Sequence, residues 1–416
     1  MLDPEIIRTQ PEAVREAVRV KGAPIDVDRL LSVDGEWRQL TFAADELRAR
    51  RNRLSKAGPS ARTEGAQVRD ELRQVEDRLR VVSEERDRLL LQVPAIPAPD
   101  VPVGPDASAN VPVKHWGRPP ELGSWQRDHV ELLHGLGALE TERTAVFAGS
   151  RAYTLRNAAV LLEQAVFRLA LDLIRPHGFD LVEVPTLLGP RPFYGTGHFP
   201  DNEGQTYEVD GRFLAGTAEV PLLGLHLDEI VDGARLPIRH LGLSACYRRE
   251  AGAAGRDTRG LYRVHEFRKL EQFAVCAADP AASDALHFEL LGHAETLLQA
   301  LELPYRVVAV CTGDMGLGKV RMHDIETWMP GRGDYGETHS CSSLGDWQAR
   351  RAGLRYRDAE GRLRYAFTLN NTAAASPRLL IPLVECHQQP DGSVRVPAAL
   401  RPHMGGIEVL SPEPAV

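Results

Sequence analysis

Arginines, glutamates, a histidine and an aromatic ring surround a glycine-rich loop in the stretch CYRREAGAAGRDTRGLYRVHEFRKLE. Arg248 and Glu250 are two residues apart, which puts both on one face of an extended strand. The same spacing recurs at Arg263, His265 and Phe267 in a second strand. A guanidinium binds phosphate or carboxylate through two parallel hydrogen bonds, and a neighbouring ring can stack on a nucleobase. The stretch therefore predicts a hairpin whose face binds a polyanion, with an exposed, ion-paired hairpin as the alternative.

A second glycine-rich stretch, GDMGLGKV, nearly matches the phosphate-binding loop G-x-x-x-x-G-K-[ST]. That motif needs a hydroxyl after its lysine to ligate Mg²⁺, and this chain has Val320 there. The residues that follow, RMHDIETWM, have poor helix signals. The stretch predicts a loop between strands and no nucleotide site of its own.

These residues need a scaffold, and the first part of the chain predicts a helical arm. Apolar residues recur at 4-3 spacing through residues 33–54 and again through 68–93, with the turn signal AGPSARTEG between them. Such spacing is typical of the seam of an antiparallel two-helix coiled coil. The outer faces are rich in glutamate and arginine, including Arg50, Arg51 and Arg53. They indicate either a solvated surface or an arm that lies along a phosphate backbone.

Prolines then crowd the segment VPAIPAPDVPVGPD, which predicts a stiff, extended linker. It separates residues 1–105, the arm with its linker, from residues 106–416. The longer part contains a helix-like stretch, NAAVLLEQAVFRLALDLIRPHG, among more numerous strand-like runs. These runs are FDLVEVPTLL, RFLAGTA, PIRHLGLSACYRRE, YRVHEFRKLEQFAV, YRVVAVC, RYAFTLN and RLLIPLVEC. Strands that often follow one another directly favour an α+β fold with a mainly antiparallel sheet flanked by helices.

Composition narrows the classes of protein further. The chain has 416 residues, of which 43% are apolar, so it can bury the cores of two domains. A net charge of −8 argues against a protein that coats nucleic acid by bulk charge, although a local basic surface is compatible with it. The five cysteines form no CxxC pair and no long apolar run is present. We therefore expect a cytoplasmic protein without a membrane span, a secretion signal or disulfides.

Several long motifs resemble one family. YRRE followed by RVHEF resembles motif 2 of the class II aminoacyl-tRNA synthetases, and the whole loop resembles the seryl-tRNA synthetase version. GFDLVEVPTLL resembles motif 1, and TLNNTAAASPRLLIPLVEC resembles motif 3. YGTGHFP, GTAEVPL, CTGDMG and SCSSLGDWQARR are also similar to that family's pattern. The resemblance covers essentially the whole chain, with residues 1–105 as the tRNA-binding arm and residues 106–416 as the catalytic domain.

The resemblance implies a two-step reaction with ATP and Mg²⁺. Serine is activated to seryl-adenylate and then transferred to the 3′ end of tRNA-Ser. Arg248 would bridge the serine carboxylate and the α-phosphate, while Arg263 and Arg378 would hold the outer phosphates. Because the substrate carboxylate attacks, the protein needs no nucleophile, only groups that position two anions and stabilise developing charge. The catalytic candidates implied are Arg248, Glu250, Arg263 and Arg378.

The same resemblance implies sets of binding residues. The ATP-binding set is Arg248, Glu250, Arg263, His265, Phe267, Glu337, Ser340 and Arg378. Glu337 and Ser340 are also the implied Mg²⁺ ligands, since this hard cation prefers oxygen. The serine-binding set is Thr217, Glu219, Arg248, Glu271, Asn370 and Thr372. Contacts with tRNA are implied for Arg256 and Arg259 on the loop and for Arg50, Arg51 and Arg53 on the arm. Motif 1 implies a homodimer.

Some positions depart from the family pattern. Asn371 stands where glycine is usual, and its side chain is expected to crowd the pocket or alter a turn. His339 stands where serine is common, and Cys386 with His387 replaces Asn-Tyr. Zinc binding by these histidines and the cysteine would need paired spacing, which is missing, so packing around the site is the expectation.

These departures suggest the first of three alternatives, and the other two are competing functions for the whole chain. One is a specialised paralogue that resists an antibiotic mimic of seryl-adenylate or supplies a biosynthetic pathway. Another is a ligase that passes an activated amino acid to a carrier protein or small molecule, for which a basic arm has no use. The last is a non-catalytic tRNA-binding paralogue, which would be expected to lose the arginines Arg248, Arg263 and Arg378.

Overall fold

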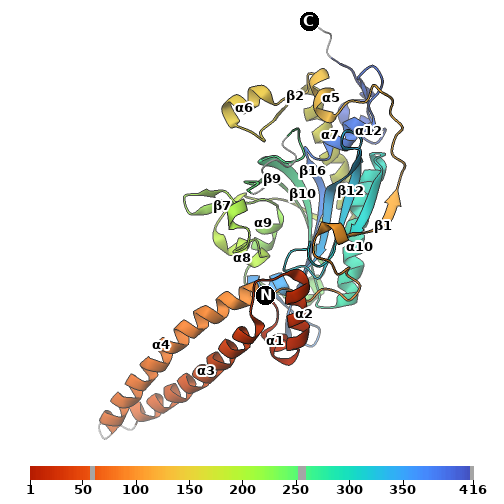
Figure 1. Ribbon diagram of the computed structural model, residues 1–416. Coiled ribbons are helices and arrows are strands. Elements are labelled where there is room, and N and C mark those ends of the chain that lie inside the picture. The colour runs from red at the N-terminus through yellow and green to blue at the C-terminus, as the bar shows by residue number, and fades with distance from the viewer. Residues whose placement is uncertain (57–60, 252–258, 413–416) are drawn as a thin grey trace. The chain divides into compact units, whose positions relative to one another are not determined.

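The computed structural model describes residues 1–56, 61–251 and 259–412 of the chain. It divides into two compact units, Met1–Ile96 and Pro97–Val416 (Figure 1). Residues 97–105 of the proline-rich segment belong to the second unit. There Ala98 N donates to Val320 O over 2.9 Å, and Thr312 N donates to Pro102 O over 2.9 Å.

In the first unit, the regular elements among the described residues are helices. Its helices are α1 Pro4–Thr9, α2 Pro11–Lys21, α3 Val27–Lys56 and α4 Arg62–Gln92. The long helices α3 and α4 lie side by side and antiparallel, and the seam predicted from the 4-3 spacing is buried at Val33, Ala44, Val68, Leu72 and Val82. The helical arm is therefore confirmed.

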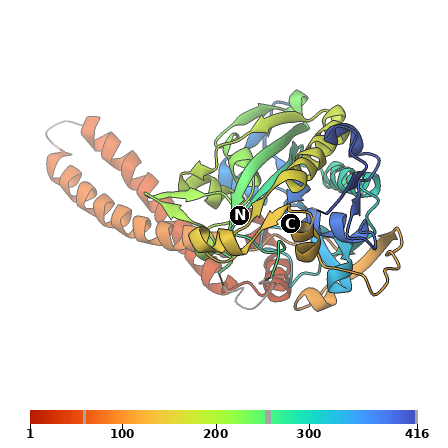
Figure 2. The same cartoon turned by 90° about the horizontal axis from the view of Figure 1, so that it is seen from above.

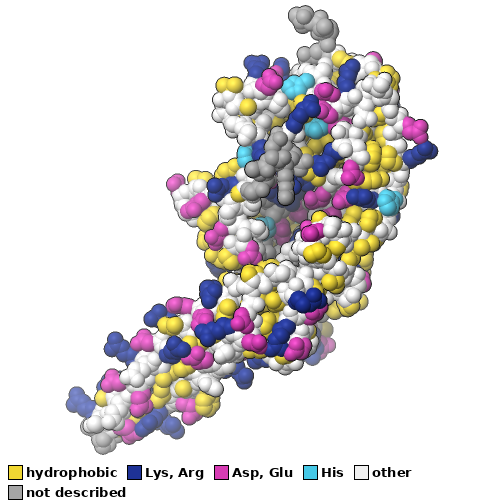
Figure 3. Space-filling model, viewed as in Figure 1, with side chains coloured by type: hydrophobic (Ala, Val, Ile, Leu, Met, Phe, Trp, Pro, Cys, Tyr) yellow, Lys and Arg dark blue, Asp and Glu magenta, His cyan; other side chains and the backbone are white. Residues whose placement is uncertain are grey.

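Ion pairs fix the register of the two arm helices. Arg29 Nη2 lies 2.7 Å from Glu85 Oε1, and Arg48 Nη2 lies 2.9 Å from Glu76 Oε1. Deeper in the seam, Arg86 Nε donates to Asp34 Oδ1 over 2.7 Å. The first two pairs are exposed and add at most about 1 kcal/mol each, whereas Arg86 and Asp34 are mostly buried beside the apolar seam. Figure 3 shows basic and acidic side chains interspersed along it.

The second unit is built on an eight-stranded sheet in the order β1-β11-β12-β13-β16-β10-β9-β4. Its strands are β1 Val111–Trp116, β4 Asp180–Glu183, β9 Ile238–Tyr247, β10 Glu266–Cys276, β11 Tyr305–Ala309, β12 Arg321–Met329, β13 Asp334–Ser343 and β16 Phe367–Ser376. All neighbours pair antiparallel except β4 with β9. The α+β fold with a mainly antiparallel sheet is confirmed.

Smaller elements surround this sheet. The remaining strands are β2 Leu139–Glu140, β3 Thr154–Leu155, β5 Leu187–Leu188, β6 Glu208–Val209, β7 Arg212–Leu214, β8 Ile230–Asp232, β14 Arg355–Arg357, β15 Leu363–Tyr365, β17 Val394–Arg395 and β18 Val409–Leu410. The helices are α5 His129–Gly135, α6 Glu142–Ala148, α7 Asn157–Ile174, α8 Pro190–Thr196, α9 Glu219–Gly224, α10 Pro280–Ala300, α11 Trp347–Ala352 and α12 Leu380–Cys386. Short 3-10 turns complete the chain, among them η3 Arg175–His177 and η6 Pro330–Arg332.

The helices α7 and α10 pack on the central strands, and the second view shows them against the sheet (Figure 2). Leu290 and Leu297 of α10 are fully buried in the main core with Leu270 of β10 and Leu369 of β16. Residues of the central strands are buried on both faces, which matches their nearly continuous apolar runs. The other face of these strands carries the candidate site.

Two expectations about local structure were wrong. The run RLLIPLVEC forms the helix α12 instead of a strand. A short apolar run does not distinguish a strand from a buried helix. Pro382 lies in the first turn of α12, where a backbone N–H has no partner within the helix, so proline is tolerated there. The arginine hairpin is also shorter than expected, since β9 ends at Tyr247 and β10 begins at Glu266. Glu250 has φ of 49°, a left-handed conformation outside the range of a regular strand.

Among the described residues, the helices are either too short or too polar to cross a bilayer.

Candidate active site

One cavity of the second unit, about 280 Å³ in volume, brings most of the predicted site residues together. Its lining includes Thr217, Glu219, Arg248, Glu250, Arg263, Phe267, Glu271, Glu337, Ser340, Asn370, Thr372 and Arg378. They come from β10, β13 and β16, from α9 and the loop before it, and from the loops that follow β9 and β16. Residues distant in sequence therefore share one concave surface, which is the usual form of a small-molecule site.

At one end of the cavity Glu219 is held by two amides. Asn370 Nδ2 donates to Glu219 Oε1 over 2.8 Å, and Gln348 Nε2 donates to the same oxygen over 2.7 Å. Gln348 is itself fixed, because Thr368 Oγ1 donates to its Oε1 over 2.7 Å. Among the described residues, no side chain hydrogen-bonds the second carboxylate oxygen, Oε2. That arrangement suits the binding of a substrate ammonium group.

Beside it, a buried carboxylate faces a buried cation. Thr217 Oγ1 donates to Glu271 Oε2 over 3.2 Å, and Lys269 Nζ forms an ion pair with the same oxygen. Burial raises the pKa of Glu271, against the opposing effect of Lys269. A buried hydroxyl and carboxylate that hydrogen-bond a substrate hydroxyl would be left unpaired by an analogue without one. Lys269 lines the cavity and was not predicted as a site residue.

A β-bulge places Glu337 and Ser340 on one face of β13. Residues three apart on a regular strand point to opposite faces. Here the register passes from Ile325 opposite His339 to Glu326 opposite Glu337, so Thr338 is the extra residue. Both Glu337 and Ser340 line the cavity as a result.

Asp324 is a residue of this region that sequence reasoning missed. It pairs with Ser340 across β12 and β13. Burial raises its pKa well above the ordinary range, and the negative charge of Glu337 adds to that shift. Its Oδ1 is buried and has no hydrogen-bond partner among the described residues. A buried, unpartnered carboxylate oxygen beside Glu337 and Ser340 fits a hard divalent cation. β12 has the sequence RMHDIETWM, in which several other residues are polar, so no signal in the sequence set Asp324 apart.

Arg378 connects the cavity wall to an aromatic side chain. Its Nη1 donates to Glu337 O over 3.1 Å, and its Nε donates to Tyr262 O over 3.3 Å. The guanidinium carbon lies 4.4 Å from the centroid of the Tyr262 ring. Two backbone contacts and the ring hold the planar group in one orientation, as bidentate binding of phosphate requires.

The arginines of the predicted hairpin, Arg248 and Arg263, line the same cavity. Arg248 Nε donates to Gly216 O over 3.3 Å, and its guanidinium carbon lies 5.1 Å from the centroid of the Phe267 ring. Arg263 Nη1 lies 3.2 Å from Glu250 Oε2. The cavity therefore presents cations and an aromatic ring together, although only Phe267 of the four residues lies in a strand.

The structure places the other predicted residues apart from this cavity. His265 Nδ1 hydrogen-bonds Arg248 O over 3.0 Å and is not among the lining residues. Arg259 Nη1 forms an ion pair with Asp128 Oδ2 at 2.6 Å. Arg256 lies outside the described residues.

On the arm unit, Arg50 Nη2 lies 2.6 Å from Glu64 Oε1. Arg51 and Arg53 are exposed. Arg51 occupies one of the positions of the 4-3 spacing, but its side chain is exposed and not buried in the seam. These three side chains present positive charge to solvent near the end of α3.

Asn371 does not crowd the cavity. It lies in the middle of β16, where its Nδ2 donates to Leu290 O of α10 over 2.6 Å. Its neighbours Asn370 and Thr372 line the cavity, so Asn371 points to the opposite face. The expectation that this residue alters a turn was wrong.

The other departures are also packed in the interior. His339 Nδ1 hydrogen-bonds Thr338 Oγ1 over 2.9 Å, and burial lowers its pKa to about 4. His387 Nε2 hydrogen-bonds Leu301 O over 2.9 Å. His339 and His387 therefore hydrogen-bond neighbouring protein atoms in the interior of the fold.

A different group, His177, Glu289 and His293, has ligand atoms within 4.8 Å of one another. Both oxygens of Glu289 hydrogen-bond Arg239. The guanidinium neutralises the carboxylate that a metal ion would need, so this group is better explained as an ion pair.

Comparisons with known proteins agree with this geometry. Residues 207–387 match the tRNA synthetase class II core domain (G, H, P, S and T), and residues 1–97 match the seryl-tRNA synthetase N-terminal domain. The fold and the site thus define a class II aminoacyl-tRNA synthetase. The chain is 49% identical to the serine--tRNA ligase of Deinococcus radiodurans over 99% of both chains. It belongs to the seryl-tRNA synthetase family.

Solved structures are similar over the same length. The seryl-tRNA synthetase of Pyrococcus horikoshii, complexed with ATP, is 36% identical and superposes with a TM-score of 0.93 over 99% of this chain and 100% of that one. The cytoplasmic serine-tRNA ligase of Naegleria fowleri, in complex with AMP, is 30% identical with a TM-score of 0.89 over 99% of both chains.

Proposed function

We propose that this chain activates L-serine with ATP to seryl-adenylate and transfers the seryl group to the 3′ end of tRNA-Ser. The observation that carries the proposal is the convergence on one cavity of Glu219, held by Asn370, with Arg248 and Arg378. The carboxylate can bind the ammonium group of an amino acid, and the guanidiniums can bind the phosphates of ATP. The relatives named above support the same substrates.

In the first step a serine carboxylate oxygen attacks the α-phosphorus, and the bond from that phosphorus to pyrophosphate breaks. Arg248 stabilises the charge that develops between carboxylate and α-phosphate, because its guanidinium can donate to both. Arg263 and Arg378 hold the leaving pyrophosphate, and Phe267 stacks on adenine. Glu250 orients Arg263 through their ion pair of 3.2 Å.

Serine is recognised by its ammonium and hydroxyl groups. Glu219 Oε2 accepts from the ammonium, while Thr217 and Glu271 hydrogen-bond the hydroxyl. Alanine would leave these buried groups unpaired, which can cost about 10⁴ in kcat/KM. Asn370 and Thr372 complete the pocket.

Mg²⁺ is proposed to bind at Glu337 and Ser340, with Asp324 as a further oxygen donor beside them. When bound, the cation neutralises phosphate charge and supports departure of pyrophosphate.

The two parts of the chain are proposed to have separate roles. Residues 1–105, the arm with its linker, bind the tRNA backbone, and residues 106–416 catalyse the reaction. The active form is proposed to be a homodimer, and the protein is proposed to act in the cytoplasm.

The test is transfer of labelled serine to a tRNA-Ser transcript in the presence of ATP and Mg²⁺, with alanine and threonine as competing substrates. We expect serine to be charged and the two analogues to be rejected. Serine-dependent ATP–pyrophosphate exchange without charging would replace the proposal by a ligase with another acceptor. Absence of exchange would refute adenylate formation itself.

A further inference from the structure

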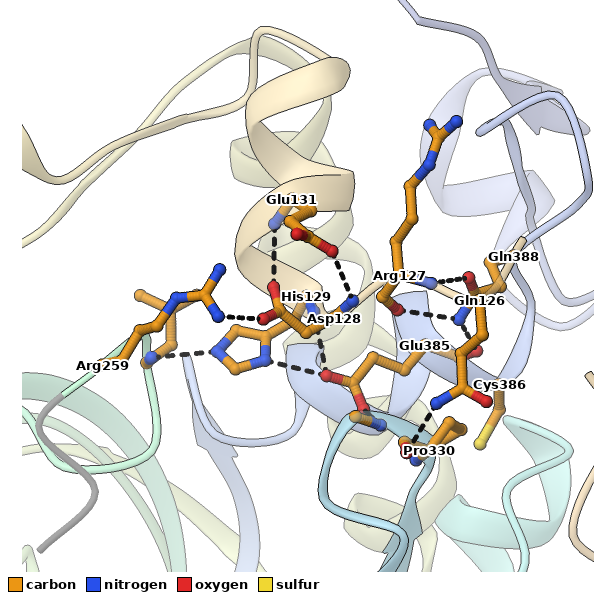
Figure 4. Close-up of polar contacts among 12 residues, drawn as sticks. Gln126, Arg127, Asp128, His129, Glu131, Arg259, Pro330, Glu385, Cys386 and Gln388 are labelled. Carbon is orange, nitrogen blue, oxygen red and sulfur yellow. Dashed lines mark hydrogen bonds and ion pairs between the residues drawn. The ribbon is translucent and has the colours of Figure 1, made fainter. Parts of the chain in front are cut away.

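His129, the first residue of α5, connects two segments that carry the proposed phosphate-binding arginines (Figure 4). Leu261 N donates to His129 Nε2 over 3.2 Å, and His129 Nδ1 hydrogen-bonds Glu385 Oε1 over 2.8 Å. Leu261 lies two residues before Arg263. Glu385 lies on α12, whose first turn follows Arg378.

The contacts define the protonation state of this imidazole. A backbone N–H is only a donor, so His129 Nε2 must accept from Leu261 and carries no proton. Nδ1 therefore carries the proton and donates it to the carboxylate of Glu385. A neutral imidazole in this tautomer is the form that satisfies both partners.

Glu385 is built to hold the ring in that orientation. Its side chain is 1% exposed, and its Oε1 also accepts from His129 N over 2.9 Å. Its other oxygen, Oε2, accepts from Gly331 N over 2.8 Å. A buried carboxylate with three N–H donors is fixed in position, and so is the imidazole bonded to it.

The loop end packs closely against the ring. Gly260 has φ of +83°, and a Cβ added there would lie 2.2 Å from His129 Nε2. The preceding residue, Arg259, is paired with Asp128 Oδ2 at 2.6 Å, while Asp128 Oδ1 accepts from Glu131 N over 3.0 Å to cap α5. The end of the β9–β10 loop is thus attached to the start of α5 at adjacent residues (Figure 4).

From this attachment the chain runs directly into the proposed ATP site. Tyr262 follows Leu261, and its ring lies between two guanidiniums, with the carbon of Arg332 and that of Arg378 each 4.4 Å from its centroid. Arg263 comes next and lines the cavity. Movement at Leu261 would displace Tyr262 and Arg263 together.

We propose that His129, oriented by Glu385, is a positioning residue for ATP: it fixes Leu261 and, through it, the placement of Tyr262 and Arg263. The inference rests on the proposed function, because it concerns the ATP site of that reaction. The serine-binding residues Thr217 and Glu219 lie on other segments, so serine binding should not depend on His129.

The test compares His129→Asn with His129→Gln in ATP–pyrophosphate exchange on the full chain. Asparagine can still donate to Glu385 but is too short to accept from Leu261. We expect it to raise KM for ATP about five- to tenfold, as loss of a hydrogen bond to a buried donor implies. KM for serine should stay within about twofold. Glutamine has an acceptor and a donor on one longer amide, so it should restore part of the ATP affinity.

A second readout is hydrogen exchange at the amide of Leu261, which should be faster in His129→Asn than in the wild type. The matched control is His115→Gln, an exposed histidine of β1 that should change neither KM. If the wild type is active and His129→Asn has the same KM for ATP, the inference is overturned. It is also overturned if His129→Asn raises KM for ATP and KM for serine equally and lowers the melting temperature. Inactivity of the wild type itself would refute the proposed function instead.

Discussion

Asn370 and Gln348 both donate to Oε1 of Glu219, over 2.8 and 2.7 Å, and so direct the other carboxylate oxygen to the substrate side. Glu219→Gln keeps an acceptor for both amides but replaces Oε2 by an NH₂ group. We expect KM for serine to rise about ten- to one-hundredfold, because a charge-assisted hydrogen bond is lost. KM for ATP should not change.

The measurement is ATP–pyrophosphate exchange at varied serine and ATP. Glu229→Gln is the matched control, since that carboxylate bonds His226 outside the cavity. A parallel rise in both KM values for Glu219→Gln would contradict a role specific to serine.

Arg378→Lys tests the need for a planar cation. Lysine cannot donate to Glu337 O and Tyr262 O while it also binds phosphate through two parallel bonds. We expect kcat for exchange to fall about 10²- to 10³-fold. Arg364→Lys, at an exposed arginine paired with Asp358, serves as the control. A loss of less than threefold would show that charge alone suffices.

The arm should affect tRNA binding and leave adenylate formation intact. Replacing Arg51 and Arg53 together by serine should reduce the slope of log Kd against log salt by about two, roughly one for each arginine that no longer binds a phosphate. Exchange with ATP and serine should be unchanged. Arg118→Ser, at an exposed arginine of the second unit, is the control. An unaltered slope would mean that tRNA does not contact these two arginines.

His339 makes stability depend on pH. Burial lowers its pKa to about 4 in the folded chain, against about 6.5 when unfolded. Its contribution to stability is complete above pH 6.5 and is lost as the pH falls toward 4, because the unfolded chain takes up the proton first. The loss is about 1.4 kcal/mol for each pH unit.

His339→Ser should therefore flatten the dependence of unfolding free energy on pH by about one proton between pH 6.5 and 4. Urea unfolding at several pH values measures this slope. His115→Ser, at an exposed histidine, should leave the slope as it is in the wild type. If both variants keep the wild-type slope, His339 is not a source of acid lability.

Asn371→Gly should destabilise the fold without altering specificity. The substitution removes the bond of Asn371 Nδ2 to Leu290 O and places a glycine within a strand. We expect the free energy of unfolding to fall by about 1–2 kcal/mol. KM for serine should stay within about twofold, since the side chain faces α10. A large change in KM for serine would place Asn371 in the pocket after all.

The amino-acid sequence by itself determined the elements with long, regular patterns. Seam residues such as Val33 and Leu72 predicted the arm, because a 4-3 spacing describes one face of a helix over many turns. The residue types around Arg248 and Phe267 predicted a cationic, aromatic surface, and long motifs indicated the family. Local residue types are enough for such conclusions, since they depend on neighbours along the chain.

Only the tertiary structure decided how these elements meet. The bulge at Thr338 puts Glu337 and Ser340 on one face, and no local pattern indicates a bulge in advance. Asn371 faces α10, and His129 joins the loop to α12. Such contacts depend on strand register and on the packing of segments more than 80 residues apart in the chain. The physical reason is that a hydrogen bond is set by distance in space, which the order of residues alone does not specify.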